Sequence, residues 1–395
     1  MTPTKFGRYD LLERIGGGGM AEVFKARSSG VAGFEKIIAI KRILPALASD
    51  SEFVALFIEE AKISAGLTHG NISQVFEFGQ IENTYFLAME FIHGQDLRGI
   101  LKQFTASRKT MPVPLAVHIV VNISAALAYA HGRKDSLGHR IGVVHRDVGP
   151  PNVLISYEGA VKLIDFGIAK AKLRNSHVTG NLAGNFSYMA PEQAGGKPID
   201  HRADLFAVGS ILYECVVGKR PFVADTDLGV LERVRHGDFV PPCQANTRVP
   251  RPLEQIILKA MKTDPEERYQ SAEELQRALE SFVQASRLNF STKQLSRWMK
   301  TTFATDLSRE GRGAKAKKPA VSSPGASATA SSRGVPFRAT DPMADDLGER
   351  PRRSTLQGFD AGRGMGSPQQ ASTMALPVIG EGGIDFAPIP SPRAP

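Results

Sequence analysis

Cysteine is scarce in this chain, whose 395 residues include only Cys215 and Cys243. Two cysteines are too few for a disulfide framework or a thiolate metal cluster, and low cysteine usage is typical of a reducing compartment. The N-terminus lacks the apolar core of a signal peptide, and no uninterrupted apolar run approaches the ~18 residues of a membrane helix. We therefore expect a cytoplasmic chain that spans no membrane.

Concentrated charge of one sign is also missing. The net charge of +9 raises nucleic acid as a possible partner, but the basic residues are dispersed, and the densest run is Lys315, Lys317 and Lys318. No signature of a nucleic-acid-binding module is present. We expect no nucleic-acid partner.

The chain divides by composition near residue 304. Gly, Pro, Ser and Ala make up about half of residues 305–395, which leaves too few apolar anchors to offset chain entropy and predicts a disordered tail. Apolar residues make up 42% of the whole chain, enough for a large core in the part before the tail.

Residues 9–304 change from strand to helix patterns along the chain. Short strands are predicted at 22–26, 37–41 and 85–90, with one helix at 51–67. Helices dominate from Leu115, and the segment 205–217 is apolar on nearly every face, which predicts a buried central helix. A small sheet-rich lobe followed by a larger helical lobe is an α+β, bilobal arrangement with a natural ligand cleft between the lobes.

A glycine run, Gly16 to Gly19, follows Ile15. A tight hairpin turn would explain it by itself. The segment from Val23 continues as a strand, whereas a dinucleotide fold or a P-loop would begin a helix here, and no Gly-Lys-Ser/Thr follows. Gly16 and Gly18 suit a hairpin whose N–H groups approach phosphate oxygens, although Ala21 stands where a third glycine is expected.

Lys41 lies in a predicted apolar strand, where a solvated strand face is the ordinary explanation. Glu60 changes that interpretation, because Leu56, Phe57 and Ile63 place it on the buried side of the 51–67 helix. An inward carboxylate needs a cation, and Lys41 is the candidate.

The strongest signal is His145-Arg-Asp-Val-Gly-Pro-Pro-Asn152, followed thirteen residues later by Asp165-Phe-Gly167. Asp147, Asn152 and Asp165 supply oxygen ligands for a hard cation and an acceptor for a hydroxyl proton. Mg²⁺ prefers one or two protein ligands completed by phosphate and water.

These residues, in this order, resemble the eukaryotic-type (Hanks-type) protein kinases, and more narrowly the bacterial serine/threonine kinases. The resemblance spans about residues 9–284 and includes three further matches: Ala190-Pro-Glu192, Asp204 and Arg268. We expect a protein kinase domain over 9–284, a helical extension over 285–304 and the tail over 305–395.

The resemblance implies ATP and Mg²⁺ as cofactors and assigns roles residue by residue. Lys41, held by Glu60, orients the α- and β-phosphates, and Asp147 accepts or orients the substrate hydroxyl proton. Asn152 and Asp165 bind Mg²⁺. The remaining nucleotide contacts, with Asp96 at the ribose and 90–92 as the adenine hinge, are Ile15, Gly16, Gly17, Gly18, Gly19, Val23, Ala39, Met89, Glu90, Ile92, Asp96 and Leu154.

The other residues that match the family pattern have structural roles or indicate which hydroxyl-bearing residue is phosphorylated. Glu192 and Arg268 match the family's buried ion pair, and Asp204 matches a helix residue that braces the catalytic loop. Pro150 favours a serine/threonine enzyme, because tyrosine kinases usually have alanine and arginine in this stretch.

Two positions depart from the family pattern. Gly149 replaces a lysine that meets the transferring phosphate, and Asn185 replaces a threonine that touches both this lysine and the catalytic aspartate. Asn185 could hydrogen-bond Asp147, but nothing in the sequence replaces the lost cation. Removing such a charge can cost roughly 10²–10³ in rate, so we expect a working but slow kinase.

Regulation is expected in the loop from Asp165 to Glu192. Arg146 matches an arginine that usually pairs with a phosphorylated loop residue. The loop offers Ser176, Thr179 and Ser187, and Thr179 is preferred because it lies mid-loop. Autophosphorylation in trans would require self-association.

Two segments after the catalytic domain have open interpretations. Leu295, Trp298, Met299 and Phe303 form an apolar stripe that either packs on the larger lobe or docks a partner. Residues 350–355 place hydroxyls after basic residues, as phosphoacceptor sites do, but also suit a solvated tail. The rival functions are a pseudokinase scaffold, favoured by Gly149 and Asn185, and a small-molecule kinase, against which Ala190-Pro-Glu192 argues.

Overall fold

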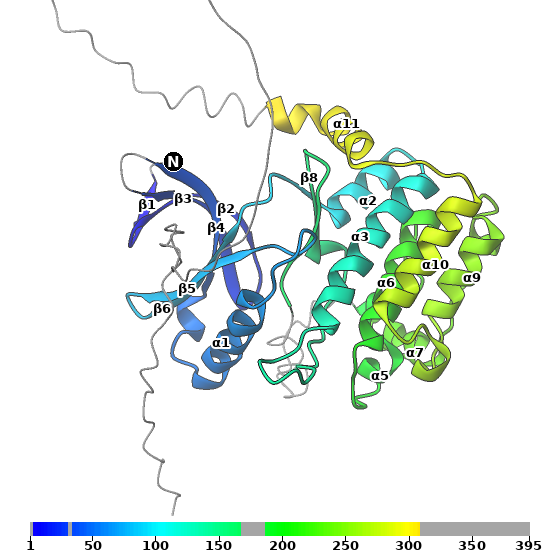
Figure 1. Cartoon of the computed structure of the whole chain (residues 1–395), viewed down its shortest axis with the longest axis horizontal. Helices are drawn as coiled ribbons and strands as arrows, with labels where there is room; N and C mark the ends of the chain where they lie inside the picture. The colour runs from blue at the N-terminus through cyan, green and yellow to red at the C-terminus, as the bar shows by residue number, and fades with distance from the viewer. Residues whose placement is uncertain (1–2, 31–33, 167–185, 309–395) are drawn as a thin grey trace, which may run out of the picture. The chain divides into compact units, whose positions relative to one another are not determined.

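The computed structural model describes residues 3–30, 34–166 and 186–308. Its elements form a β-rich lobe and a larger helical lobe, as the sequence predicted (Figure 1). Of the tail predicted over 305–395, residues 305–308 are described and helical, and residues 309–395 lie outside the described residues, as do Ser176, Thr179 and Asn185.

The first lobe is built on a six-stranded antiparallel sheet in the order β1-β2-β3-β4-β6-β5. Alternation along β6 shows how the sheet is covered: Phe86 and Ala88 belong to one apolar cluster, and Leu87 belongs to another, with residues of helix α1. The strands are β1 (Thr4–Phe6), β2 (Tyr9–Gly17), β3 (Ala21–Ser29), β4 (Glu35–Ile43), β5 (Val75–Ile81) and β6 (Thr84–Glu90).

Helix α1 (Ser51–Ala65) packs on this sheet through its apolar side. Asp50 caps its start by accepting hydrogen bonds from the backbone N–H groups of Glu52 and Phe53. Phe53 and Phe57 are buried against β4 and β6, and Glu60 lies on the same buried side. The cap and the apolar stripe together fix the direction from which Glu60 approaches the sheet.

The second lobe is helical, with a small three-stranded sheet, β7-β8-β9, at its edge. Helix α6 (Arg202–Val217) is buried along nearly its whole length, as its composition predicted, and packs on α3 (Val113–His131) and α9 (Arg251–Ala260). The other elements are β7 (Gly94–Asp96), α2 (Leu97–Ala106), β8 (Val153–Ser156), β9 (Val161–Leu163), α5 (Pro191–Ala194), α7 (Asp227–His236), α8 (Pro242–Ala245), α10 (Ala272–Ala285) and α11 (Thr292–Thr302). Short 3-10 turns lie at Pro45–Leu47, Pro150–Asn152, Phe186–Tyr188 and Pro265–Glu267.

Helix α3 is long and apolar enough to cross a membrane by length and composition alone, with a mean hydropathy of 1.8. His118 and Asn122 interrupt the segment, so it contains no uninterrupted apolar run of membrane-spanning length. A core helix of a soluble protein passes the same test, and 61% of the apolar window is buried. Its predicted stripe, Leu115, Ile119, Ile123 and Leu127, lies in the main core.

Helix α11 packs on the helical lobe, the ordinary interpretation of its apolar stripe. Leu295, Met299 and Phe303 are buried in the main core, and Trp298 is partly buried against it. Ser291 and Gln294 form a capping box at its start. The helix that the sequence predicted within residues 285–304 is therefore present, and its apolar side is covered by this chain.

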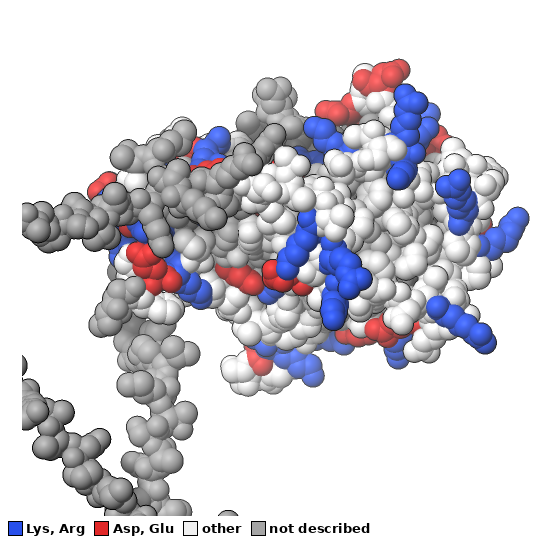
Figure 2. All heavy atoms as spheres, turned by 90° about the horizontal axis from the view of Figure 1, so that it is seen from above, with Lys and Arg blue, Asp and Glu red and all other residues white. Residues whose placement is uncertain are grey.

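Charged side chains are scattered over the surface. On the face seen in Figure 2, lysines and arginines stand singly or in small groups among uncharged residues.

Candidate active site

Lys41 connects the two lobes through two carboxylates. Its Nζ lies 2.7 Å from Glu60 Oε1 on α1 and 2.9 Å from Asp165 Oδ1 after β9. Lys41 and Glu60 are both buried, so the pairing predicted from helix periodicity is confirmed. Burial acts to lower the pKa of Lys41, but the charges of Asp165 and Glu60 outweigh it and raise the pKa above its ordinary value. Lys41 is therefore a fixed cation next to Asp165.

The catalytic loop is anchored by Asp204 at the start of α6. Its Oδ2 accepts hydrogen bonds from His145 N–H and His131 Nε2, and its Oδ1 accepts one from Arg146 N–H, all at 2.8 Å. Burial alone would raise the pKa of Asp204, but the hydrogen bonds from His131 and the backbone keep it below its ordinary value. Arg146 has a φ of 65°, a conformation that needs such support in a residue with a side chain. Asp204 thus holds the strained residue directly before Asp147.

Asp147 is positioned from its other side by Asn152. The Nδ2 group of Asn152 donates to Asp147 O at 2.7 Å and to Asp147 Oδ2 at 2.9 Å. Because the amide donors face Asp147, the amide oxygen of Asn152 is left as the acceptor. Asn152 O also accepts a hydrogen bond from Ile164 N–H at 3.0 Å, which brings Asn152 next to Asp165.

The donor set fits the cation that the sequence predicted. An amide oxygen and a carboxylate are hard oxygen ligands, and Mg²⁺ completes its octahedron with water and phosphate. Among the described residues, no group of three or more His, Cys, Asp or Glu could hold a metal ion. The site therefore suits an ion that arrives with its own phosphate ligands better than a closed structural metal.

Asp165 is held in place by its neighbours in the chain. Its φ of 55° is left-handed, a strained conformation typical of functional sites. The ring of Phe166 packs against His145, with centroids 4.6 Å apart, and His145 Nε2 lies 3.0 Å from Ile164 O. Burial lowers the pKa of His145. These contacts tie the Asp165 segment to the catalytic loop.

The glycine run forms a hairpin, as expected, and no helix follows it. Gly16 pairs with Val23 across β2 and β3, and Gly18 N–H donates to Ala21 O at 3.0 Å. Val23 pairs in turn with Lys41, so this hairpin lies one strand away from the lysine. Ile15 is 46% exposed, which leaves its side chain open to a ligand under the turn.

The residues assigned to adenine come from adjacent strands. Ala39 pairs with Met89 across β4 and β6, and Leu154 lies on β8 opposite Asp96 of β7. The backbone N–H of Glu90 donates to Gln74 O at 2.8 Å. Ile92 follows in the short segment that joins the lobes. The fold therefore brings these residues together, while their contacts to a nucleotide remain a prediction.

Asp96 has a structural role that the sequence analysis did not consider. Its Oδ1 accepts a hydrogen bond from Gly99 N–H at 2.6 Å as the N-cap of α2, and its Oδ2 lies 3.3 Å from Arg98 NH2. The cap explains an acidic residue here without a ribose.

Arg268 and Glu192 form the expected buried ion pair, with N–O distances of 2.8 and 2.7 Å. The remaining N–H groups of Arg268 donate to the carbonyl oxygens of Lys262, Thr263 and Arg202. All five guanidinium donors are thereby satisfied, as a fully buried arginine requires.

Ser187 is a poor phosphorylation site, contrary to its inclusion among the loop candidates. It is 5% exposed, and its hydroxyl donates to Phe222 O at 3.0 Å. The other candidates, Ser176 and Thr179, lie outside the described residues.

Lys162 is a site residue that the sequence analysis missed. Its Nζ lies 2.8 Å from Glu90 Oε2, so an ion pair joins the hinge to the strand before Asp165. Only the alternation of β9, with Lys162 between buried Val161 and Leu163, could have indicated it.

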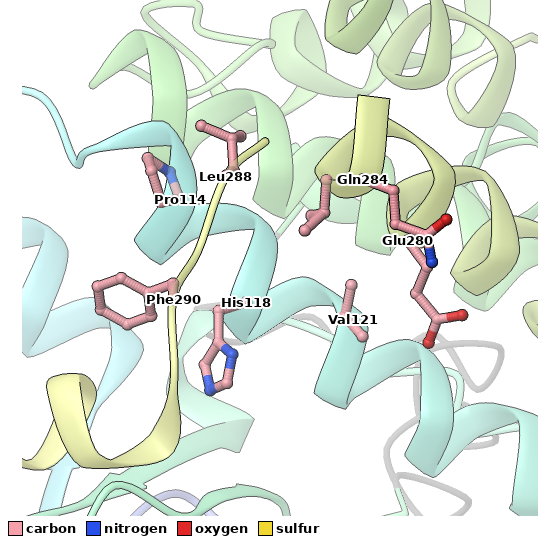
Figure 3. A pocket seen from close by; sticks show the side chains of 8 residues that line it. Pro114, His118, Val121, Glu280, Gln284, Leu288 and Phe290 are labelled. Atoms are coloured by element: carbon pink, nitrogen blue, oxygen red, sulfur yellow. The ribbon is translucent and has the colours of Figure 1, made fainter. Parts of the chain in front are cut away.

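A pocket of about 220 Å³ lies elsewhere, between α3, α10 and the segment that leads to α11 (Figure 3). None of the predicted site residues lines it, so it is not the nucleotide site. Its lining is Pro114, His118, Val121, Glu280, Val283, Gln284, Leu288 and Phe290.

Known proteins share this arrangement. The protein kinase domain family matches residues 9–279. The tyrosine-protein kinase MasK of Myxococcus xanthus is 42% identical over 279 residues, covering 70% of this chain and 43% of MasK. The serine/threonine-protein kinase PknB of Mycobacterium leprae is 35% identical over 274 residues, covering 68% of this chain and 42% of PknB. The chain thus spans about two fifths of the length of these relatives.

A solved structure agrees with the fold. The kinase domain of PknI from Mycobacterium tuberculosis superposes with a TM-score of 0.54 at 26% identity, covering 71% of this chain and 98% of that domain. The ordered site residues, the family match and this fold lead to one conclusion: the chain belongs to the protein kinase family, as a Hanks-type kinase of the bacterial group.

Proposed function

We propose that this chain is a serine/threonine protein kinase that transfers the γ-phosphate of ATP to protein hydroxyl groups. The observation that carries the proposal is the Lys41 bridge between Glu60 and Asp165, next to an Asp147 that Asn152 orients. A chain without catalytic selection has no reason to retain all five residues.

The proposed roles are those that the resemblance to the kinase family implies, and the geometry of the site is compatible with them. Lys41 binds the α- and β-phosphates, and Asp147 accepts the hydrogen bond of the acceptor hydroxyl, whose oxygen attacks the γ-phosphorus as the bond to ADP breaks. Asn152 and Asp165 would hold Mg²⁺, which neutralises charge on the phosphates. The carbonyl of Glu90 and the N–H of Ile92 would pair with adenine, and Val23, Ala39 and Leu154 would enclose it.

Labelled ATP tests the proposal directly. The purified chain with Mg²⁺ and a generic protein acceptor should incorporate label, and Asp147→Asn should abolish incorporation. Asp225→Asn, an exposed aspartate before α7, is the matched control and should retain it. Nucleotide binding without transfer by the wild type would instead support the pseudokinase scaffold.

The acceptor residue has a second candidate. Pro150 and the relatives named serine/threonine kinases support Ser/Thr, whereas the 42% identical MasK is named a tyrosine kinase. Acid hydrolysis of the labelled product separates the two. Phosphoserine or phosphothreonine is expected, and phosphotyrosine alone would assign the chain to tyrosine.

We also propose regulation by autophosphorylation, with Thr179 as the first site. Supporting it, Arg146 lies directly before Asp147, its Nε has no hydrogen-bond partner among the described residues, and a loop phosphate is a group that arginine pairs with. Thr179→Ala should lower the activity of enzyme recovered from ATP-treated cultures. Unchanged turnover with no phosphate in the loop would reject the idea.

The cellular setting is part of the proposal. We place the kinase domain in the cytoplasm with ATP and protein substrates as partners, because the apolar helix α3 is mostly buried in the domain core. Trans-autophosphorylation would bring two copies together.

A further inference from the structure

Helix α11 follows the part of the chain that matches the kinase family, yet its contacts lead to the nucleotide hinge. The family match ends at residue 279, whereas α11 begins at Thr292. Leu295 and Met299 are fully buried, and the ring of Trp298 stacks on Phe104 of α2 with centroids 5.4 Å apart and planes 4° apart. Figure 1 shows α11 beside α2 and β8.

The turn between β8 and β9 is held by α11 at three successive residues. Ser296 Oγ donates to Tyr157 O at 2.8 Å, and Lys300 Nζ lies 2.9 Å from Glu158 Oε2. Gly159 has a φ of +85°, and a Cβ there would lie 2.3 Å from Thr292 O. A glycine is required for this approach, so turn and helix fit closely.

Tyr157 connects the turn that α11 holds to β7, the strand that follows the hinge. Its N–H donates to His93 O at 2.9 Å, its ring meets the ring of His93 edge-on at 4.8 Å, and its hydroxyl accepts a hydrogen bond from Gln95 Nε2 at 3.0 Å. Tyr157 is 1% exposed. One buried residue, through its backbone and its side chain, thus joins α11 to residues 93–95, directly after Ile92.

The segment before α11 is held less closely than α11 itself. Leu288 and Phe290 face α3 across the pocket of Figure 3, and the ring of Phe290 lies 5.4 Å from that of His118. The pocket leaves part of this segment unpacked. The position of α11 is therefore set by its own contacts with α2 and with the turn 157–159.

We propose that α11 is a positioning element for the adenine-binding hinge, with Ser296 acting through Tyr157 and Trp298 fixing the helix on Phe104 of α2. The inference rests on the proposed binding of ATP by Glu90 and Ile92. Loss of these contacts loosens the turn at Tyr157, shifts β7 together with its partner strand β8 and displaces the backbone of Ile92. Apparent affinity for ATP then falls, while turnover at saturating ATP is kept, because Lys41, Asp147 and Asp165 are positioned by other elements.

Steady-state kinetics of the whole chain test whether the KM for ATP changes while kcat does not. Ser296→Ala removes one hydrogen bond and should raise the KM for ATP about threefold to tenfold with kcat within about twofold. Trp298→Ala should raise the KM for ATP more than Ser296→Ala does. Trp298→Phe keeps a stacking ring, so its KM should lie close to that of the wild type. Phe290→Ala, which removes a half-buried ring from the neighbouring segment, is the control and should leave KM unchanged.

Binding of ATP and Mg²⁺ by calorimetry separates the possible failures. A wild type that binds no nucleotide would overturn both the proposed function and this inference. A wild type that binds, with Ser296→Ala and Trp298→Ala binding equally well, would overturn the inference alone. A fall in kcat and melting temperature in both variants, without a change in KM, would also overturn it, since α11 would then act only on stability.

Discussion

Replacing Asp204 with asparagine exchanges one carboxylate oxygen for an amide group at the anchor of the catalytic loop. The carboxylate accepts from His131 and His145 on one oxygen and from Arg146 on the other. An amide retains one acceptor oxygen, and its NH₂ group then faces an N–H donor. At least one of the three buried donors loses its partner in Asp204→Asn.

The magnitude follows from these three bonds. Losing one charge-assisted hydrogen bond costs about 1.5–3 kcal/mol, and the other two weaken by about 1 kcal/mol each when the charge is removed. We expect the free energy of unfolding to fall by about 3.5–5 kcal/mol, within the range for a broken buried ion pair. The left-handed Arg146, which costs about 1–3 kcal/mol, would relax and displace Asp147. A shift of about 1 Å in a catalytic group lowers the rate about 100-fold.

Urea unfolding and labelled-ATP turnover measure the two effects on the same protein. Asp225→Asn should match the wild type in both assays. The pKa of Asp204 is depressed in the fold, so its stabilisation is present above its usual value of 3.8 and is lost as pH falls through the lower folded value. The stability difference between wild type and Asp204→Asn should therefore shrink in strong acid. If the free energy of unfolding of Asp204→Asn lies within about 1 kcal/mol of the wild-type value at neutral pH and kcat is unchanged, Asp204 does not anchor the catalytic loop.

Three further changes test other contacts. Arg268→Lys leaves the buried Glu192 and three carbonyls short of donors, so urea unfolding should show a loss of about 3–5 kcal/mol; a change below about 1 kcal/mol would contradict the structural role. Lys162→Met removes the ion pair to Glu90 and should raise the KM for ATP by about threefold with little change in melting temperature, and an unchanged KM would show that the pair does not position the hinge. Gly149→Lys restores a cation near the catalytic aspartate. The backbone there is extended (φ −169°, ψ 165°), so a side chain brings no left-handed strain, and kcat should rise about tenfold or more. An unchanged kcat would mean that the missing cation does not limit transfer.

Local periodicity was enough to predict the Lys41–Glu60 pair. A helix with Phe53 and Phe57 on its buried side must also bury Glu60, and a buried carboxylate requires a cation. The strands flanking Lys41 and the buried helix α6 were predictable for the same reason, since alternation and all-round apolarity are local properties of a sequence.

Contacts between residues that lie far apart in the sequence, and whose local pattern gives no sign of burial, were not predictable in this way. Lys162 and Glu90 are 72 positions apart, and each is a partly buried charged residue of a strand. Asp96 reads equally well as a ribose ligand or as a helix cap, and only its 2.6 Å contact with Gly99 N–H reveals the cap. The stripe on α11 predicted a helix with a buried side, but its place beside Tyr157 depends on how α2 and the β8–β9 turn pack.

The departures from the family pattern affect one half of the catalytic machinery. Asp147 is positioned by Asn152 and by the loop that Asp204 anchors, and neither contact involves Gly149. Among the described residues, the positioning of Asp147 is therefore independent of Gly149, and we expect the substitution to remove only the electrostatic stabilisation that a lysine would add. Lys41, Asn152 and Asp165, to which the proposal gives the phosphates and Mg²⁺, are retained, whereas stabilisation of the transferring phosphate governs rate. Such a kinase should therefore bind ATP normally and turn over slowly. Measuring the two quantities separately distinguishes a slow enzyme from a scaffold, because a scaffold would show no label that depends on Asp147.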